Sequence, residues 1–227
     1  METKKDPDFV NIVFEGLGDP ENQTDIRRQF LGLDIPSTSK MPFGTSRNIY
    51  YLNLNSYLVV AKESNFGKRN KDGSMLPVSP EDEIRACILF QTMLNELTRL
   101  PENVVWIKAE RPIGILTYTT PPSRGEKLVY TVYERIEGGY HGDVIQYFDD
   151  PPIRGASFVP KYFILNGIME DTVRFLKSAI DEFLGPNGER IVWPDFDKHQ
   201  LIVEELSPRS YGVHVVDFEH CYIRPKI

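Results

Sequence analysis

The chain has 227 residues, of which 41% are hydrophobic and 26% are charged, so it is long enough to bury a sizeable apolar core. Its formal net charge of -7 argues against general nucleic-acid binding, because phosphate contacts need clustered Lys and Arg, and the basic residues here are scattered. With two cysteines, Cys87 and Cys221, no disulfide framework is expected. The apolar runs are far shorter than the roughly 20 residues that span a bilayer, so we expect a cytoplasmic protein without membrane insertion.

The first strand signal in the chain follows an acidic, Pro-punctuated N-terminal extension, residues 1–40. Residues 47–64, RNIYYLNLNSYLVVAKES, are rich in aromatic and β-branched residues, and the Asn-containing LNLNS lies between two such runs. This pattern predicts a β-hairpin, and Lys62 lies at the end of its second strand.

A helix is predicted over residues 79–100. Ser79 followed by Pro80 and by acids in the first turn is a strong start signal. Apolar residues then recur at helical spacing, at Cys87, Phe90, Leu94 and Leu97. One turn before this stripe lies Glu83, so a carboxylate continues an apolar face.

The rest of the chain alternates strand and helix signals. NVVWIKAE, IGILTYTT and LVYTVYERI, the last ending at Gly138-Gly139, predict a mostly antiparallel β-layer. Residues 169–185 predict an amphipathic helix that stops at Gly185-Pro186, with apolar positions at Val173, Leu176, Ile180 and Phe183. Two short strands around a polar turn end the chain.

This order of elements, with VVAK, a helix Glu, WPDFDKHQ and DFE at matching places, resembles the protein-kinase-like superfamily of eukaryotic-type kinases and aminoglycoside phosphotransferases, in a minimal, C-terminally truncated form. The resemblance implies an α+β, two-lobed fold with an antiparallel N-lobe sheet, one helix and a reduced, mostly helical C-lobe. It further implies an N-terminal extension at 1–40, an N-lobe at 41–137 and a C-lobe at 138–227.

The resemblance assigns the nucleotide-binding roles to the first half of the chain. Lys62 would contact the α and β phosphates of ATP, and Glu83 would pair with it and fix its direction, with Glu81 as the competing carboxylate. Gly44 would bring backbone N–H groups over the phosphates. Glu134 and Ile136 of TVYERIEGG would offer backbone groups to adenine.

The catalytic and metal-binding roles fall in the second half. Asp195 stands five residues before Gln200, as in the family's catalytic loop, and would accept or orient the proton of the attacking hydroxyl, with Asp197 as a rival base. Gln200 and Asp217 would bind magnesium, because a hard cation prefers oxygen ligands.

The chain also departs from the family pattern. Trp193 and Pro194 stand where His and Arg are usual, Gln200 replaces Asn, and Glu219 replaces the Gly after Asp-Phe. The four histidines lack metal-ligand spacing and are predicted to be structural or surface residues. His199 is the exception to keep in view, because it lies beside the proposed base in the chain.

The predicted function is an ATP- and magnesium-dependent phosphotransferase that transfers a phosphoryl group to a hydroxyl of a protein or small molecule. The alternative from another class is a pseudokinase, a nucleotide-binding or protein-interaction module without catalysis. A third reading is a domain without a nucleotide site, since fold resemblance does not secure function.

Overall fold

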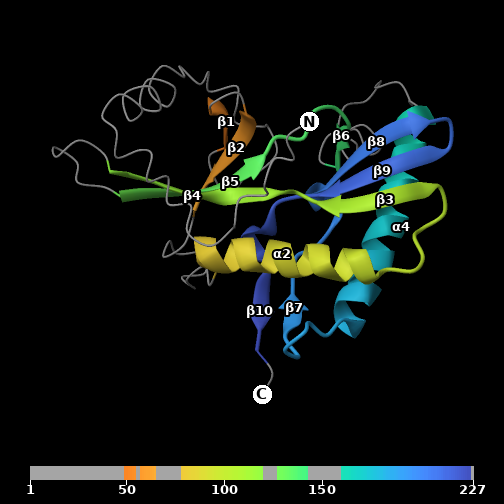
Figure 1. Cartoon of the computed structure of the whole chain (residues 1–227). Coiled ribbons are helices and arrows are strands. Elements are labelled where there is room, and N and C mark those ends of the chain that lie inside the picture. Colours follow the sequence, from red (N-terminus) through yellow and green to blue (C-terminus); the bar gives the residue numbers. More distant parts are fainter. Residues whose placement is uncertain (1–48, 55–56, 65–77, 120–126, 143–159, 226–227) are drawn as a thin grey trace, which may run out of the picture. The chain divides into compact units, whose positions relative to one another are not determined.

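The computed structural model describes residues 49–54, 57–64, 78–119, 127–142 and 160–225 (Figure 1). The chain divides into two compact units. Unit 1 consists of Met1–Ile84 and Arg111–Arg135, and unit 2 of Arg85–Glu110 and Ile136–Ile227. Residues 85–110, assigned to the N-lobe from the sequence, therefore group with unit 2.

Unit 1 holds a four-stranded antiparallel sheet with the order β1-β2-β5-β4. Its strands are β1 (Ile49–Leu54), β2 (Tyr57–Glu63), β4 (Pro112–Thr119) and β5 (Lys127–Glu134). The pairing of β1 with β2, from Ile49 opposite Lys62 to Leu54 opposite Tyr57, confirms the predicted hairpin. Buried Val59, Ala61 and Val132 contribute apolar side chains to the core of this unit.

Helix α2 (Pro80–Glu96) begins in unit 1 and continues into unit 2. Its start is as predicted, because the hydroxyl of Ser79 accepts a hydrogen bond from the backbone N–H of Asp82 at 3.1 Å. Pro80 occupies the first helical position, where its missing N–H costs nothing. Cys87, Phe90 and Leu94 of the predicted stripe are buried.

Unit 2 contains a four-stranded sheet with the order β3-β9-β8-β6 and a two-stranded sheet of β7 and β10. The strands of unit 2 are β3 (Val104–Ala109), β6 (Tyr140–His141), β7 (Arg190–Val192), β8 (Leu201–Ser207), β9 (Ser210–Val215) and β10 (Tyr222–Arg224). Two short 3-10 helices, η3 (Lys198–Gln200) and η4 (Phe218–His220), follow β7 and β9.

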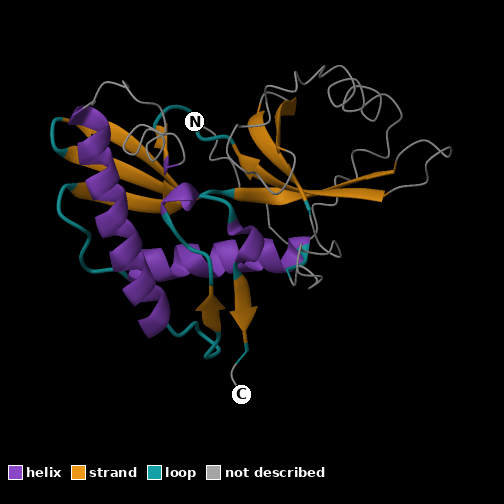
Figure 2. Cartoon of the chain, turned by 180° about the vertical axis from the view of Figure 1, so that it is seen from behind, coloured by secondary structure: helices purple, strands orange, loops and turns teal. Residues whose placement is uncertain are grey.

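Helix α4 (Pro160–Glu182) lies across one face of the four-stranded sheet of unit 2, as the two opposite views show (Figure 1, Figure 2). It begins nine residues before the predicted start of 169. The predicted apolar face is confirmed, because its four members are buried: Val173, Leu176, Ile180 and Phe183. Among the described residues, no helix is both long and apolar enough to cross a membrane.

The predicted fold class, a two-lobed kinase-like α+β fold with a mostly helical C-lobe, is wrong. The described part of residues 138–227 has one α-helix, α4, whereas strands and short 3-10 turns form the rest, so the chain is a mixed α/β protein. The physical reason is local. Outside α4, this region consists of short β-branched runs such as LIVEELS and SYGVHV, which favour strands over helices.

The strands of the predicted antiparallel layer belong to two different sheets. Strand β3 pairs in parallel with β9, more than 100 residues away in the chain, instead of joining the sheet of unit 1. In this pairing Trp106 lies opposite Gly212. A Cβ atom at position 212 would collide with the Trp106 indole, so glycine permits the close approach of these two strands.

Candidate functional site

Two groups of polar residues stand out, one in each unit. In unit 1, Lys62 of β2 and Glu83 of the first turn of α2 are buried, with 5% and 3% of their surface exposed. Charged side chains are rarely buried this deeply without partners. The competing carboxylate, Glu81, is exposed, so Glu83 is the residue of the pair whose side chain enters the unit.

Both charged groups of unit 1 contact Tyr133 of β5. The ammonium of Lys62 lies 4.7 Å from the centroid of the Tyr133 ring, a cation–π contact. The Tyr133 hydroxyl donates to Oε1 of Glu83 at 2.7 Å, and the Thr131 hydroxyl donates to the same oxygen at 3.2 Å. These four residues, Lys62, Glu83, Thr131 and Tyr133, are called the Glu83 cluster below.

Strand pairing explains how the Glu83 cluster forms. Lys62 lies directly opposite Thr131 in the antiparallel pair of β2 and β5. Thr131 and Tyr133 are two residues apart on β5, so their side chains point to the same face of the sheet. Glu83 then reaches this face from the first turn of α2. The cluster presents a buried cation whose orientation is fixed by its neighbours.

In unit 2, the two candidate bases of the predicted catalytic turn, Asp195 and Asp197, have different partners. Asp197 caps η3, since its carboxylate accepts from the backbone N–H of Lys198 at 2.8 Å. The side-chain oxygen of Gln200 accepts in return from the backbone N–H of Asp197 at 2.7 Å, which completes a capping box. Asp197 is therefore used in the turn itself, and the buried Gln200 holds its amide oxygen against that turn.

Asp195, by contrast, is exposed and its carboxylate contacts Nδ1 of His220. The two residues lie 25 positions apart, in the turn after β7 and in η4. The hydrogen bond to Asp195 raises the pKa of His220 above 6.5, although partial burial opposes the shift. The charges of Asp217 and Glu219 raise it further. Asp195 and His220 are called the Asp195–His220 pair below.

Asp217 adopts a left-handed backbone conformation, with φ 64° and ψ 65°. Residues other than glycine seldom do this, although Asp is among the better tolerated. The conformation is held in place, because the backbone N–H of Asp217 donates to Oε1 of Glu110 at 2.7 Å. Glu110 is itself buried, and its backbone N–H donates to the carbonyl of Val215 at 2.8 Å.

An aromatic group supports the two segments that carry Asp195 and Asp217. Trp193 and Phe218, each next to or near one of these acids in the chain, have ring centroids 4.5 Å apart. Phe90 of α2 contacts both rings edge-on, at 5.6 Å and 5.4 Å. Phe196 packs on Trp193 at 4.7 Å. This buried packing fixes the backbone from which the acidic side chains project.

The remaining predicted site residues contribute less. Glu134, at the end of β5, is exposed, and its backbone N–H donates to the carbonyl of Arg111 at 2.9 Å. Ile136 follows the strand and is half-buried. Gly44 lies outside the described residues. In the described part of the chain, no group of three or more His, Cys, Asp or Glu side chains is arranged to hold a metal ion.

Sequence reasoning missed two residues of unit 2. His220 was expected to be a structural or surface residue, and only its place directly after DFE hinted at a role beside Asp195. Glu110 had no local signal, because its partner Asp217 is 107 positions away. No protein-family model matches the chain, and a search among curated proteins gives no significant match.

Proposed function

We propose that the protein is an ATP- and magnesium-dependent phosphotransferase whose acceptor is a hydroxyl group of a protein or small molecule. The observation that carries the proposal is the Glu83 cluster. Lys62 keeps a cation at a largely buried place beside the Tyr133 ring. A cation held in this way supports the proposal, because phosphotransferases use a fixed lysine to bind nucleotide phosphates.

Each unit contributes different chemistry to the proposal. In unit 1, Lys62 would bind phosphate oxygens, while Glu83 and Tyr133 hold its ammonium in position. In unit 2, Asp195 would accept the proton of the acceptor hydroxyl, and His220 would orient its carboxylate. Catalysis of this kind depends on positioning and on neutralising charge, with no covalent intermediate on the protein.

The two residues predicted to bind magnesium, Asp217 and Gln200, do not fit the ion equally well. Asp217 offers a carboxylate at a fixed backbone position, which suits magnesium, and bound magnesium ATP would supply the phosphoryl group and neutralise its charge. Gln200 fits less well as a second ligand, because its amide oxygen already accepts from Asp197. This observation favours the second candidate function, a nucleotide-binding or protein-interaction module without catalysis.

Calorimetric titration of ATP, with and without magnesium, tests the proposal. Asn tolerates the left-handed conformation, so Asp217→Asn removes the charge with little backbone strain. We expect magnesium-dependent binding in the natural protein and at least about tenfold weaker binding in the variant. Asp181→Asn, at an exposed position of α4, makes the same change of charge and should bind normally. Equal binding by both variants would contradict the magnesium assignment, and no binding by any protein would contradict the function.

A further inference from the structure

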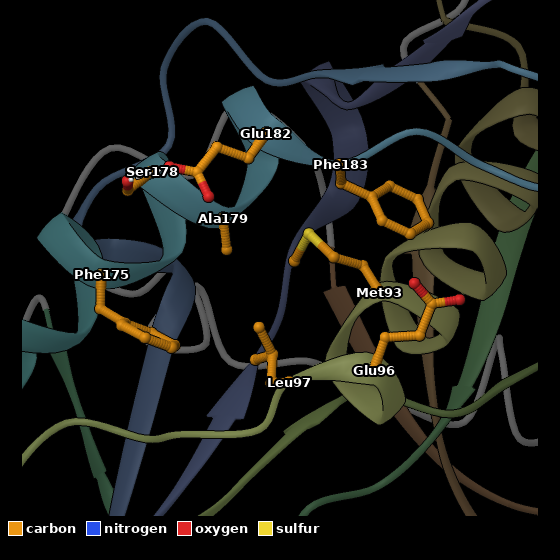
Figure 3. Close-up of a pocket in the computed structure, with 8 residues that line it drawn as sticks. All are labelled: Met93, Glu96, Leu97, Phe175, Ser178, Ala179, Glu182 and Phe183. Carbon is orange, nitrogen blue, oxygen red and sulfur yellow. Dashed lines mark hydrogen bonds between the residues drawn. The ribbon is translucent and has the colours of Figure 1, made fainter.

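A cavity of about 280 Å³ opens in unit 2 where the C-terminal ends of α2 and α4 meet (Figure 3). About half of its wall is apolar, and five of its eight lining residues are apolar: Met93, Leu97, Phe175, Ala179 and Phe183. Met93 and Phe183 are buried and form its floor, whereas Leu97 and Phe175 are half-buried at its sides. Pockets for whole small molecules usually start at roughly 300 Å³, so this cavity suits one or two side chains.

The polar rim of the cavity is acidic. Glu96 and Glu182 line it, each the last residue of its helix, and both are exposed. The third polar residue, Ser178, donates its hydroxyl to Oε1 of Glu182 at 3.4 Å. None of the eight residues that line the cavity is basic.

Helix dipoles add to this negative charge. The C-terminal end of a helix carries about half a negative charge, so Lys or Arg is favoured in the last turn. The last turns of α2 and α4 contain no basic residue, and each ends in a glutamate instead. At the end of α4, Arg190, which does not line the cavity, donates to the carbonyl of Asp181 at 3.4 Å. The carboxylates of Glu96 and Glu182 remain on the lining, where no side chain provides a complementary cation.

Exposed apolar residues continue from both helix ends. Leu100 follows α2 and Leu184 follows α4, with 36% and 55% of their surface exposed. Exposed apolar residues close to both helix ends in the chain suit an extended partner better than a compact small molecule.

We propose that this cavity binds a peptide segment of a partner protein in which a bulky apolar residue is flanked by Lys or Arg. The apolar side chain enters the cavity between Met93 and Phe183, and the flanking cations meet Glu96 and Glu182. Charge complementarity carries the choice of partner, because Glu96 and Glu182 line the cavity and none of its eight lining residues is basic. The proposal is independent of the phosphotransferase function.

The test measures fluorescence anisotropy of a labelled twelve-residue peptide, in which Leu and Phe are flanked by Lys and Arg, titrated with the full chain. One control peptide replaces Lys and Arg with Glu, and another replaces Leu and Phe with Ser. We expect saturable binding of the first peptide alone. Binding of the Ser peptide with equal affinity would overturn the proposal, because it would reflect only attraction to a protein of net charge -7.

Variants locate the binding site. The double variant Glu96→Gln/Glu182→Gln should bind the peptide about tenfold more weakly. Glu102→Gln/Glu137→Gln makes the same charge change at two exposed positions outside the cavity and should bind normally. Equal weakening by both pairs would overturn the proposal.

A cavity-filling variant tests the apolar half of the proposal. Ala179→Phe keeps both carboxylates and should abolish binding. Methyl NMR of the natural protein provides a readout that needs no mutation: peptide should shift the methyl signal of Met93 but not that of Met169, which is fully buried and does not line the cavity. An unmoved Met93 signal at saturating peptide would overturn the proposal even if Ala179→Phe fails to fold.

Discussion

The Glu83 cluster of unit 1 and the Asp195–His220 pair of unit 2 use similar chemical groups in opposite surroundings. Lys62 and Glu83 are buried, and one carboxylate oxygen of Glu83 accepts from both Tyr133 and Thr131. Asp195 and His220 contact each other with 43% and 36% of their side-chain surface exposed. Burial makes the first group expensive to disturb, whereas exposure leaves the second accessible to a substrate and responsive to pH.

This contrast indicates a division of roles. A buried charge network keeps one geometry because every alternative leaves polar groups without partners. An exposed ion pair contributes little to stability. Substitutions in the Glu83 cluster should therefore change the free energy of unfolding, whereas substitutions in the Asp195–His220 pair should change mainly its pH dependence.

The largest expected effect on stability comes from Glu83→Ala. The substitution removes the acceptor at 2.7 Å from the buried Tyr133 hydroxyl, whereas the Thr131 hydroxyl keeps the carbonyl of Lys62 at 3.4 Å. A lost acceptor of this kind costs about 1–3 kcal/mol. We expect the free energy of unfolding to fall by about 3 kcal/mol. Glu83→Gln keeps an acceptor oxygen and should lose about 1 kcal/mol. Urea unfolding followed by far-UV circular dichroism measures both, and an unchanged midpoint for Glu83→Ala would show that the cluster is not a network.

A smaller effect is expected at Asp217, where the backbone is left-handed. Asp217→Ala should be less stable than Asp217→Gly by about 1 kcal/mol, because alanine strains this conformation and glycine does not. Tryptophan fluorescence can follow the unfolding of unit 2, since both tryptophans, Trp106 and Trp193, lie there.

The same pair of substitutions at an ordinary helical position provides the control. Asp171, exposed on α4, should give the opposite order, with Gly less stable than Ala by about 1 kcal/mol. If Gly were less stable than Ala at position 217 as well, the left-handed conformation of Asp217 would not contribute measurably to the free energy of unfolding.

The smallest effect concerns pH. The pKa of His220 is raised, so its pairing with Asp195 stabilises the fold fully below about pH 6.5 and loses this effect as pH rises through the raised value. Burial lowers the pKa of His214, against the charge of Glu204 and together with that of Lys108. Its contribution has the opposite sign: it is present above about pH 6.5 and is lost as pH falls through the lowered value.

Stability measured from pH 5 to 9 separates the two histidines. His220→Gln should reduce stability relative to the natural protein mainly at acidic pH, by less than about 1 kcal/mol because the pair is exposed. His214→Gln should change the pH dependence in the opposite direction. A His220→Gln curve parallel to that of the natural protein would contradict the Asp195–His220 pair.

The sequence predicted the elements that depend on residues close to one another in the chain. The hairpin of β1 and β2, the start of α2 at Ser79 and the buried face of α4 all follow from residues within a few positions of one another. The early start of α4 also had a signal, since Pro160 occupies its first helical position. Gly167, a poor helix former, obscured that signal.

Long-range pairings could not be predicted in the same way. The parallel pairing of β3 with β9, the bond from Asp217 to Glu110 and the contact of Asp195 with His220 join residues that are 25 to 107 positions apart. The residues near each partner in the sequence do not predict which distant residue it contacts, although the position of His220 after DFE hinted at a role beside Asp195. The pairing of β3 with β9 also removed β3 from the predicted antiparallel layer.

Release of labelled γ-phosphate from ATP in the presence of magnesium tests the central claim most directly, with water as the acceptor and the protein in excess. We expect release that Lys62→Met and Asp217→Asn abolish and that Asp195→Asn slows by about 10² to 10⁴. Binding of ATP without release would favour the second candidate function, a nucleotide-binding module without catalysis. Release that continues at the natural rate in Asp217→Asn would contradict the proposed function.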